Sequence, residues 1–415
     1  MNMTRRQFLK QMGLLSLMSI MPISSNSWAY LGQNDNLNKP RLIVIFLRGA
    51  VDGLNVVVPY GDSHYFEYRP SIGLPRPGMA DGILDLDGYF GLHPVLASVL
   101  PFWKENSLAF VHASGSPDPN RSHFEAQDYM ESATPGNART PDGWMNRLLG
   151  VLPKPHNPIQ AVSFGETTPK SLMGPMTVAN MPLGRGAANK TPLDRTDLEK
   201  VFNGFYNDDR ELSHVYHEAI TARKQLMTDL TAETKAANNG APSVVGFASD
   251  TRQLAQLIAR EPRVELAFLA VGGWDTHVNE GSHDGQLARH LNELGNGLAA
   301  LVPGLGSTYD NTVIVVMSEF GRTAHENSNG GTDHGHGNVM WLMGGPIQGG
   351  KVYGKWPGLA PDALYQGRDL AVTTDFRDVL YQVNGRHFGL SPTQLAKVLP
   401  GFSATPTLME GLIRA

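Results

Sequence analysis

The sequence contains no cysteine among its 415 residues. This absence excludes disulfide bonds, zinc sites built on thiolates and catalysis by a cysteine nucleophile. Any metal ion that the chain binds must therefore be held by nitrogen and oxygen ligands, which histidine, aspartate and glutamate supply.

The sequence also lacks a basic stripe, a nucleotide-binding fingerprint and, after the N-terminus, a membrane-spanning segment. The formal net charge is −5 and the basic residues form no stripe, which argues against binding to nucleic acid. Short pieces such as Gly335-His336-Gly337 lack the spacing and the helix start of a nucleotide-binding fingerprint. After the N-terminus, no segment has the roughly twenty apolar residues that a membrane-spanning helix needs. We therefore expect no stable membrane anchor.

The N-terminus carries a targeting signal. Residues 4–10 read TRRQFLK, the pattern of bacterial twin-arginine export. A short apolar stretch follows over residues 12–23, and Ser27-Trp28-Ala29 matches a cleavage site. We predict a signal peptide over residues 1–29 that is recognised by the twin-arginine machinery and by signal peptidase, and a folded protein in the periplasm or outside the cell. The alternative is an uncleaved amphipathic helix that happens to begin with basic residues.

The mature chain, residues 30–415, is interpreted as one α/β domain. Five apolar runs without polar alternation predict buried strands of a parallel sheet that is covered on both faces, at residues 42–47, 108–112, 264–271, 312–317 and 339–343. Helices are expected over residues 249–260 and 286–301, and a helical insert at about 190–240. Residues 60–89, rich in Pro, Gly and Asp, are expected to form a surface loop.

Acidic, basic and imidazole groups lie close to the ends of four of these strands. Ligands of open α/β sheets bind at the carboxyl ends of the strands, so these groups are expected to meet there: Asp52, Asp275, His277, Glu319, Arg322, Asp333, His334 and His336. Carboxylates and imidazoles without thiolates favour Zn²⁺ or Mn²⁺ over Mg²⁺ or Ca²⁺. The composition predicts a site for one or two such ions, with an arginine beside it to hold an anion.

Ser122 lies where a helix is expected to begin. With Glu125 three residues later it has the sequence of a capping box, in which the hydroxyl only caps the helix. The same position lies in the positive field of a helix N-terminus, which stabilises an alkoxide or a bound oxyanion. In that second interpretation Ser122 is a nucleophile or ligand, Arg121 holds the anion, and His123 is a ligand or an acid or base. Both interpretations stay open.

Five motifs together resemble a known family: RGAVDGLN at residues 48–55, RSHF at 121–124, GWDTH at 273–277, SEFGRT at 318–323 and GTDHG at 331–335. On these motifs the chain resembles the exported bacterial family named domain of unknown function 1501, over about residues 41–389. That family is grouped with the alkaline phosphatase-like superfamily, which includes sulfatases and cofactor-independent phosphoglycerate mutase. The resemblance implies a mostly parallel central sheet with helices on both faces.

The resemblance also implies roles for single residues. Asp52 would ligate one metal ion, and Ser122 would be the nucleophile. Asp275 and His277 would hold the other ion, which one of the two histidines at positions 334 and 336 would complete.

The chain departs from the superfamily pattern at one position in particular. Glu319 would stand where the superfamily has the aspartate of an Asp-His pair, and Phe320 occupies the place of the histidine. Asp333 or His123 would then have to substitute as a ligand. The spacing between Asp275 and His277 is also shorter than the usual one.

Two functions follow from these patterns. The first is an exported metal-dependent hydrolase of phosphate or sulfate esters, in which Ser122 attacks a small anionic or glycan-linked ester while Arg322 or Arg121 holds the anion. The second is a non-catalytic exported protein that binds a metal or ligand on a degenerate hydrolase scaffold, which the missing imidazole at Phe320 favours.

Overall fold

The computed structural model describes residues 39–165, 167–181, 235–405 and 409–414. The predicted signal peptide at residues 1–29 lies outside the described residues. The same holds for the helical insert predicted at about 190–240, except for residues 235–240.

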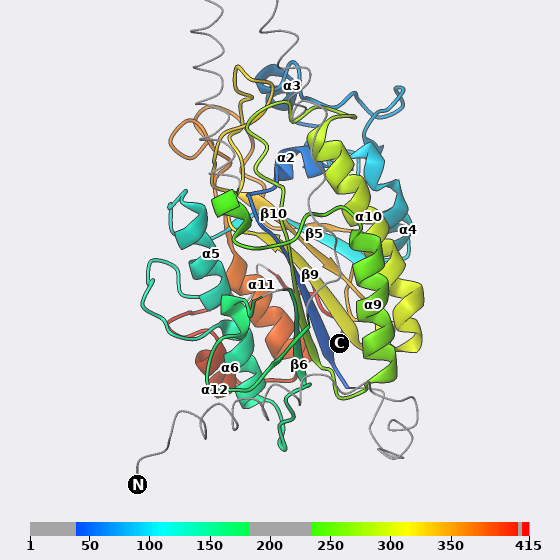
Figure 1. Cartoon of the computed structure of the whole chain (residues 1–415). Helices are drawn as coiled ribbons and strands as arrows, with labels where there is room; N and C mark the ends of the chain where they lie inside the picture. Colours follow the sequence, from blue (N-terminus) through cyan, green and yellow to red (C-terminus); the bar gives the residue numbers. More distant parts are fainter. Residues whose placement is uncertain (1–38, 166, 182–234, 406–408, 415) are drawn as a thin grey trace, which may run out of the picture. The chain divides into compact units, whose positions relative to one another are not determined.

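A central sheet organises the described part of the chain (Figure 1). Its strand order is β11-β5-β10-β9-β1-β8-β6-β7, with β12 beside β5. All strand pairs are parallel except those of β10, which is antiparallel to both β5 and β9. The strands are β1 (Arg41–Leu47), β5 (Leu108–Gly115), β6 (Ala161–Phe164), β7 (Ala179–Met181), β8 (Leu266–Val271), β9 (Thr312–Ser318), β10 (Asn338–Met343), β11 (Val352–Tyr353) and β12 (Thr374–Asp375).

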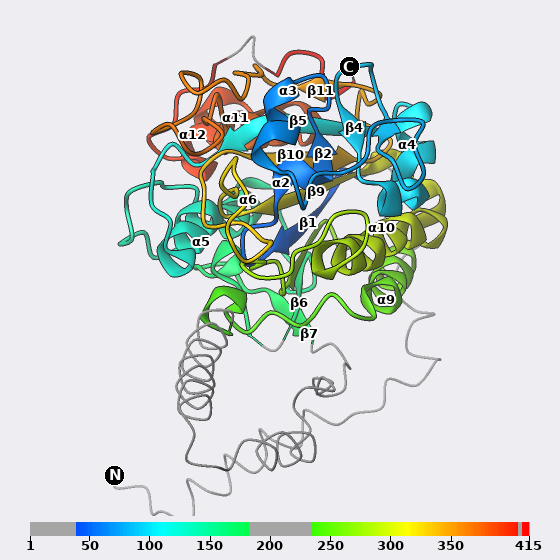
Figure 2. The ribbon, with the colours of Figure 1, turned by 90° about the horizontal axis from the view of Figure 1, so that it is seen from above.

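Helices cover both faces of this sheet (Figure 2). One face packs against α4 (Leu100–Lys104), α9 (Phe247–Arg260) and α10 (Gln286–Leu305), together with the 3₁₀-helix η2 (Pro94–Val99). The other face packs against α5 (His123–Ser132), α6 (Trp144–Val151), α11 (Phe376–Gln382) and α12 (Pro392–Val398). Alternate residues of β1 enter the two cores, and the whole strand is buried. The prediction of an α/β fold with a mostly parallel, doubly covered sheet is confirmed.

The smaller elements surround this frame. A three-stranded antiparallel sheet joins β2 (Val57–Val58), β4 (Gly91–Leu92) and β3 (Leu84–Asp85). The short helices are α2 (Gly53–Val56), α3 (Ser63–Tyr68), η3 (Lys170–Leu172), η5 (Gly306–Asn311) and η6 (Val383–His387). The prediction that residues 60–89 form only a surface loop is wrong, because this stretch contains α3 and the buried side chains of Arg69, Ile72 and Leu74.

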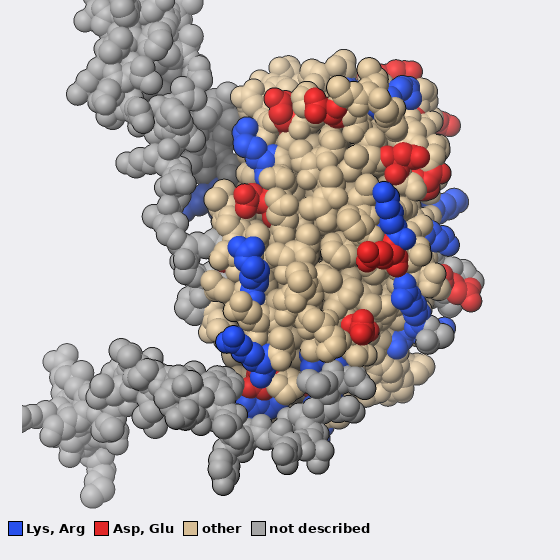
Figure 3. Space-filling view, turned by 90° about the vertical axis from the view of Figure 1, so that its right-hand side faces the viewer, with Lys and Arg blue, Asp and Glu red and all other residues tan. Residues whose placement is uncertain are grey.

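The surface on the side of α9 and α10 carries scattered charges (Figure 3). In this view single basic and acidic side chains surround a wide uncharged area. Within the described ranges, no helix combines the length and the apolar character that crossing a membrane requires.

The register of the sheet sets the place of the polar groups. Leu47, the last residue of β1, lies beside both Val271 of β8 and Ser318 of β9. Because these three strands are parallel and end together, the segments that follow them leave the sheet at one edge.

Candidate metal centre

The loops after β1 and β8 approach each other closely at this edge. Gly49 has a φ of +114°, and a Cβ atom there would lie 2.7 Å from the backbone nitrogen of Asp275. Glycine alone tolerates both this φ and this contact. The close approach brings Asp275 and His277 beside the groups that follow β1 and β9.

Two imidazoles and one carboxylate come together at this edge, and a third imidazole lies beside them. The Nε2 atom of His334 lies 2.9 Å from Nε2 of His123 and 3.0 Å from Nε2 of His277. Oδ1 of Asp275 lies 3.0 Å from Nε2 of His277, 3.4 Å from that of His334 and 3.6 Å from that of His123. Around a tetrahedral zinc ion with bonds of about 2.0–2.1 Å, neighbouring ligand atoms lie roughly 3.3 Å apart. The ligand atoms of His123, Asp275 and His334 all lie within 4.8 Å of one another, the spacing of a metal-ligand set, and His277 lies beside Asp275 and His334.

Each of the three imidazoles has an acceptor for its other ring nitrogen. The Nδ1 contacts are 2.8 Å from His123 to Oε1 of Glu319, 3.1 Å from His334 to the backbone oxygen of Arg121, and 3.4 Å from His277 to Oδ1 of Asp333. With a cation bound, a proton on Nδ1 would satisfy each acceptor and leave the Nε2 lone pair for the ion; without one, Nε2 of His277 lies 3.4 Å from Nη1 of Arg322. Histidines that bind metal ions are held in this way by carboxylates and carbonyl oxygens.

Asp275 contributes a buried charge to the same point. Its Oδ1 accepts a hydrogen bond of 2.6 Å from the buried guanidinium of Arg322. Burial alone would raise the pKa of Asp275, but the neighbouring histidines and Arg322 hold it well below its usual range. Its Oδ2 is buried and has no hydrogen-bond partner within the described residues. An orphaned carboxylate oxygen beside imidazole lone pairs fits a cation, so His123, Asp275 and His334, with His277 beside them, could hold a divalent ion.

Burial and charge also shift the pKa values of His123 and Glu319. Burial would lower the pKa of His123, but Asp275 and Glu319 outweigh it and raise this pKa to about 9. Burial would raise the pKa of Glu319, but hydrogen bonds from His123 and Gln127 lower it to about 2. The contact between Nδ1 of His123 and Oε1 of Glu319 thus contributes to both pKa shifts.

Glu319, predicted to be a ligand, lies behind His123 and outside the group of His123, Asp275 and His334. Its Oε1 accepts hydrogen bonds from the Gly49 backbone (2.8 Å), from His123, and from Gln127 (2.9 Å), and its Oε2 accepts one from Ser318 (2.9 Å). The Glu319 carboxylate is fully buried, and both of its oxygens accept hydrogen bonds. It orients His123.

Asp52, predicted to be a metal ligand, pairs with an arginine in this structure. Both of its oxygens accept hydrogen bonds from the buried guanidinium of Arg69, which forms a two-pronged ion pair with it. Burial would raise the pKa of Asp52, but Arg69 lowers it. Burial and the charge of Asp52 raise the pKa of the neighbouring Glu280 well above its usual range, and its Oε2 accepts hydrogen bonds from Thr276 and Thr332. Both carboxylates that were predicted to be ligands outside the cluster, Asp52 and Glu319, thus contact side chains of the protein.

The two arginines predicted to hold an anion lie in different settings. Arg322 is buried and donates to the backbone oxygens of Gly49, Ala50 and Trp274 as well as to Asp275. It positions Asp275 and is not open to a substrate. Arg121 is partly exposed and pairs with Asp369.

Three remaining residues surround the converging atoms. His336 packs its ring against Tyr365 with centroids 4.6 Å apart and takes no part in the group, so the choice between the two histidines falls on His334. Phe320 packs its ring 4.9 Å from that of His123 and 5.2 Å from that of His334. The residue that replaces an expected imidazole therefore forms an apolar wall of the site.

A pocket of about 770 Å³ opens beside the converging atoms. His123 and His334 line it together with Arg121, Ser122, Phe124, Lys235, Ala236, Ala237, Asn239 and Gly240. Ser122 stands at the N-cap position of α5, but its side chain makes no cap hydrogen bond, and Glu125 bonds to Asn120 instead. The capping-box interpretation is therefore wrong, and Ser122 is an exposed residue that lines the pocket.

Residues 93–399 match the family described as "Protein of unknown function (DUF1501)". The chain belongs to this family. No curated protein matched the sequence.

Several solved structures are distantly similar to this DUF1501 protein. They are Ps i-CgsB in complex with k-i-k-neocarrahexaose (13% identity, 86% of this chain and 74% of that chain, TM-score 0.39), a 2-O GAG sulfatase (13%, 89% and 74%, 0.38), and the lipoteichoic acid synthase LtaP from Listeria monocytogenes (9%, 74% and 66%, 0.34).

Three residues of the DUF1501 site carry no signal that singled them out in the sequence. Arg69 and Glu280 lie in loops without a motif, and only the fold brings them to Asp52. Gln127 lies four residues after His123, one helical turn along α5, which is a spacing that could have marked it.

The Asp52→Asn substitution distinguishes an ion pair from a metal ligand in this DUF1501 protein. Breaking a buried pair leaves Arg69 without its counter-charge, so the free energy of unfolding should fall by up to about 3–5 kcal/mol, less whatever Glu280 restores by ionising. Metal content should stay that of the wild type. Urea denaturation, with chelator present, measures the free energy of unfolding, and elemental analysis measures the metal content. A variant of unchanged stability that has lost its metal would refute this assignment.

Proposed function

We propose that this protein is an exported, metal-dependent hydrolase of phosphate or sulfate esters, with Ser122 as its nucleophile. The observation that carries the proposal is the convergence of three imidazole Nε2 atoms and Oδ1 of Asp275, each imidazole being held from behind through its Nδ1. Three nitrogens and one carboxylate oxygen without thiolates favour Zn²⁺ or Mn²⁺. When bound, such an ion would supply Lewis-acid polarisation of the ester.

The proposed ligands are His123, Asp275, His277 and His334, for a single ion. Two further carboxylates had been expected to hold a second ion. Arg69 balances one of them, Asp52, and His123 uses the other, Glu319. One cation is therefore the number that the donors support.

The residues of the pocket suit an anionic ester. Ser122 carries an uncapped hydroxyl at the start of the ten-residue helix α5, where the field of the helix N-terminus favours its ionised form. Arg121 and Lys235 supply positive charge on the same wall. We infer that they hold the ester anion while Ser122 attacks and the alcohol leaves, and that water then releases phosphate or sulfate.

The pocket is large enough for a small anionic ester or for the end of a glycan-linked one. From the signal peptide predicted at residues 1–29 we infer that the protein passes through the twin-arginine machinery and acts in the periplasm or outside the cell.

A second candidate function is a non-catalytic exported protein that binds a metal or a ligand. Phe320 and the Asp52–Arg69 ion pair favour it, because both remove features of a two-ion hydrolase. Incubating the zinc- or manganese-loaded protein with aryl phosphates and aryl sulfates separates the two. Release of phosphate or sulfate that stops on chelation supports the hydrolase, and a metal-loaded protein without turnover supports the binding protein.

A further inference from the structure

We propose that Gln127 is a positioning residue of the metal centre, which holds the Glu319 carboxylate behind His123 and ties the pocket rim at Ala237 and Asn239 to that carboxylate. The inference rests on the proposed metal centre and does not depend on hydrolysis.

The position of Gln127 places its amide behind the ligand. Gln127 follows His123 by one helical turn, so the two side chains leave α5 on the same face. Only 1% of Gln127 is exposed. Its Nε2 donates to Oε1 of Glu319 at 2.9 Å, and this same oxygen lies 2.8 Å from Nδ1 of His123. Glu319 thus bonds to two residues of a single helical turn.

Every hydrogen-bonding site of the Gln127 amide is used. The second Nε2 proton goes to the backbone oxygen of Ala237 at 2.6 Å, and Oε1 accepts from Arg48 and, at 3.3 Å, from Asn239. Turning the amide over would set oxygen against the Glu319 carboxylate and nitrogen against the Arg48 guanidinium. Its orientation is therefore determined by charge.

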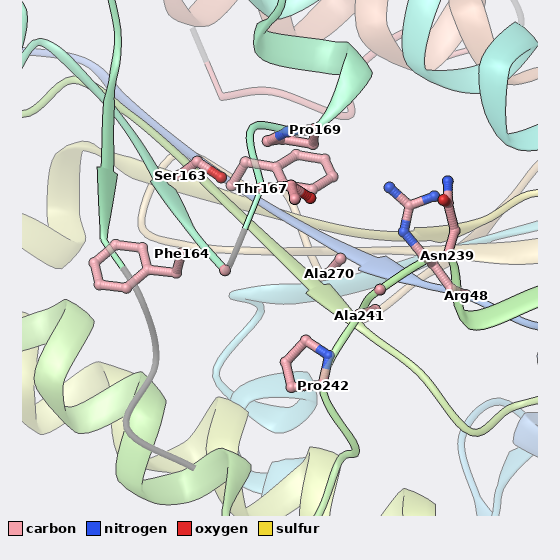
Figure 4. A pocket seen from close by; sticks show the side chains of 12 residues that line it. Arg48, Ser163, Phe164, Thr167, Pro169, Asn239, Ala241, Pro242 and Ala270 are labelled. Carbon is pink, nitrogen blue, oxygen red and sulfur yellow. The ribbon is translucent and has the colours of Figure 1, made fainter. Parts of the chain in front are cut away.

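Arg48 anchors this amide from the other side. It is buried and pairs with Glu131 at 2.5 Å. Figure 4 shows the side chains of Arg48 and Asn239 next to each other beside a small pocket behind the Asn239–Gly240 turn. Both donate to Oε1 of Gln127. A buried ion pair, an amide and a carboxylate thus form a continuous chain of contacts that ends at a proposed metal ligand.

The Gln127 amide also contacts residues that line the proposed substrate pocket. Ala237 and Asn239 line the pocket that His123 and Ser122 line. A ligand that moves this rim must also move the partners of Gln127, and through them Glu319. By thermodynamic linkage, the rim contact and the metal affinity then depend on each other.

The test compares the metal affinity of Gln127 variants with that of a matched control. Gln127→Met keeps the length of the side chain and removes its polar atoms, and Gln127→Glu keeps its shape and its bond to Arg48 but places a second carboxylate against Glu319. Loss of an outer partner of a metal ligand typically costs about 10–100-fold in metal affinity, so the Zn²⁺ Kd should rise by that factor in both variants. Competition with a chromophoric chelator measures the Kd, and thermal unfolding measures the stability.

Asn146→Leu is the control. Asn146 is also a fully buried amide on a helix. Its hydrogen bonds go to the backbone of Leu172 and Met176 and to none of the proposed metal ligands. This variant should lose stability and keep the wild-type Kd. Asn239→Gly, which keeps the positive φ of 45° accessible, should raise the Kd only a few-fold, because it removes one arm of the network.

Two results would overturn the inference. One is a wild-type Kd in both Gln127 variants, and the other is an equal loss of affinity in Asn146→Leu, which would make the effect one of general stability. A wild-type protein that binds no Zn²⁺ would instead refute the metal centre itself, so the two failures are distinguishable.

Discussion

Replacing Asp275 by asparagine is expected to weaken metal binding more than a hundredfold. Oδ1 of Asp275 lies within 3.6 Å of all three histidine Nε2 atoms and is the only carboxylate oxygen in the converging group. Removing a residue that only orients a metal ligand already lowers metal affinity about 10–100-fold, so removing a charged ligand itself must lower it more. The buried Arg322 also loses its counter-charge, which should lower the free energy of unfolding of the metal-free protein by about 3–5 kcal/mol. Chelator competition and urea denaturation measure the two effects.

Asp333→Asn is the matched control. Asp333 contacts the same group, but its side chain is 58% exposed and its Oδ1 lies 3.4 Å from Nδ1 of His277. An exposed and distant acceptor positions its histidine weakly, so this variant should lose less than about tenfold in affinity. If Asp275→Asn and Asp333→Asn bind metal equally well, Asp275 is not a ligand.

Replacing Ser122 by alanine is expected to lower kcat at least about 10³-fold while metal content and stability stay unchanged. The side chain of Ser122 is exposed at the pocket and makes no cap hydrogen bond, so its loss removes a nucleophile and little structure. The assay follows release of phosphate or sulfate from the best ester found by screening, with elemental analysis of each preparation.

Ser116→Ala serves as the control for this result. Ser116 lies in the same connection between β5 and α5, and its hydroxyl accepts from the Asp118 backbone outside the pocket. Its loss should leave kcat within a few-fold of the wild type. An active protein that is indifferent to Ser122→Ala would remove Ser122 from the reaction, and metal binding without turnover in any variant would favour the binding protein.

The place of the site could be predicted from the sequence. The strands β1, β8 and β9 are continuous apolar runs followed by glycine or acidic residues, and parallel strands bring their carboxyl ends to one edge. Asp275 and His277 follow β8 directly, so their position near that edge was expected, and the structure places them there.

The partners of the carboxylates could not be predicted. Glu319 and His123 are 196 residues apart, and nothing local shows that the glutamate faces Nδ1 of the histidine instead of a metal ion. Arg69 lies in a stretch rich in Pro, Gly and Asp that has no apolar periodicity. It nevertheless forms an ion pair with Asp52, because a buried carboxylate needs a counter-charge. Sequence patterns locate the ends of the strands. They do not show which of several carboxylates pairs with an arginine or a histidine in the folded chain.

The choice between His334 and His336 has the same cause. Both lie in one Asp-His-Gly-His segment, but the backbone pairing of His334 with Arg322 directs the first toward the converging atoms. The second packs on Tyr365. The backbone pairing across the loop between residues 322 and 334, which the sequence does not show, thus distinguishes two neighbouring imidazoles.

The metal content of the exported protein, purified without chelator beside a His277→Ala variant, tests the central claim most directly. Elemental analysis should find about one equivalent of zinc or manganese in the wild type, because His123, Asp275 and His334, with His277 beside them, hold one ion, and a large loss in the variant. A folded wild-type protein without metal that takes up none on addition would contradict the metal centre. Two equivalents would contradict the assignment of Asp52 to Arg69 and of Glu319 to His123.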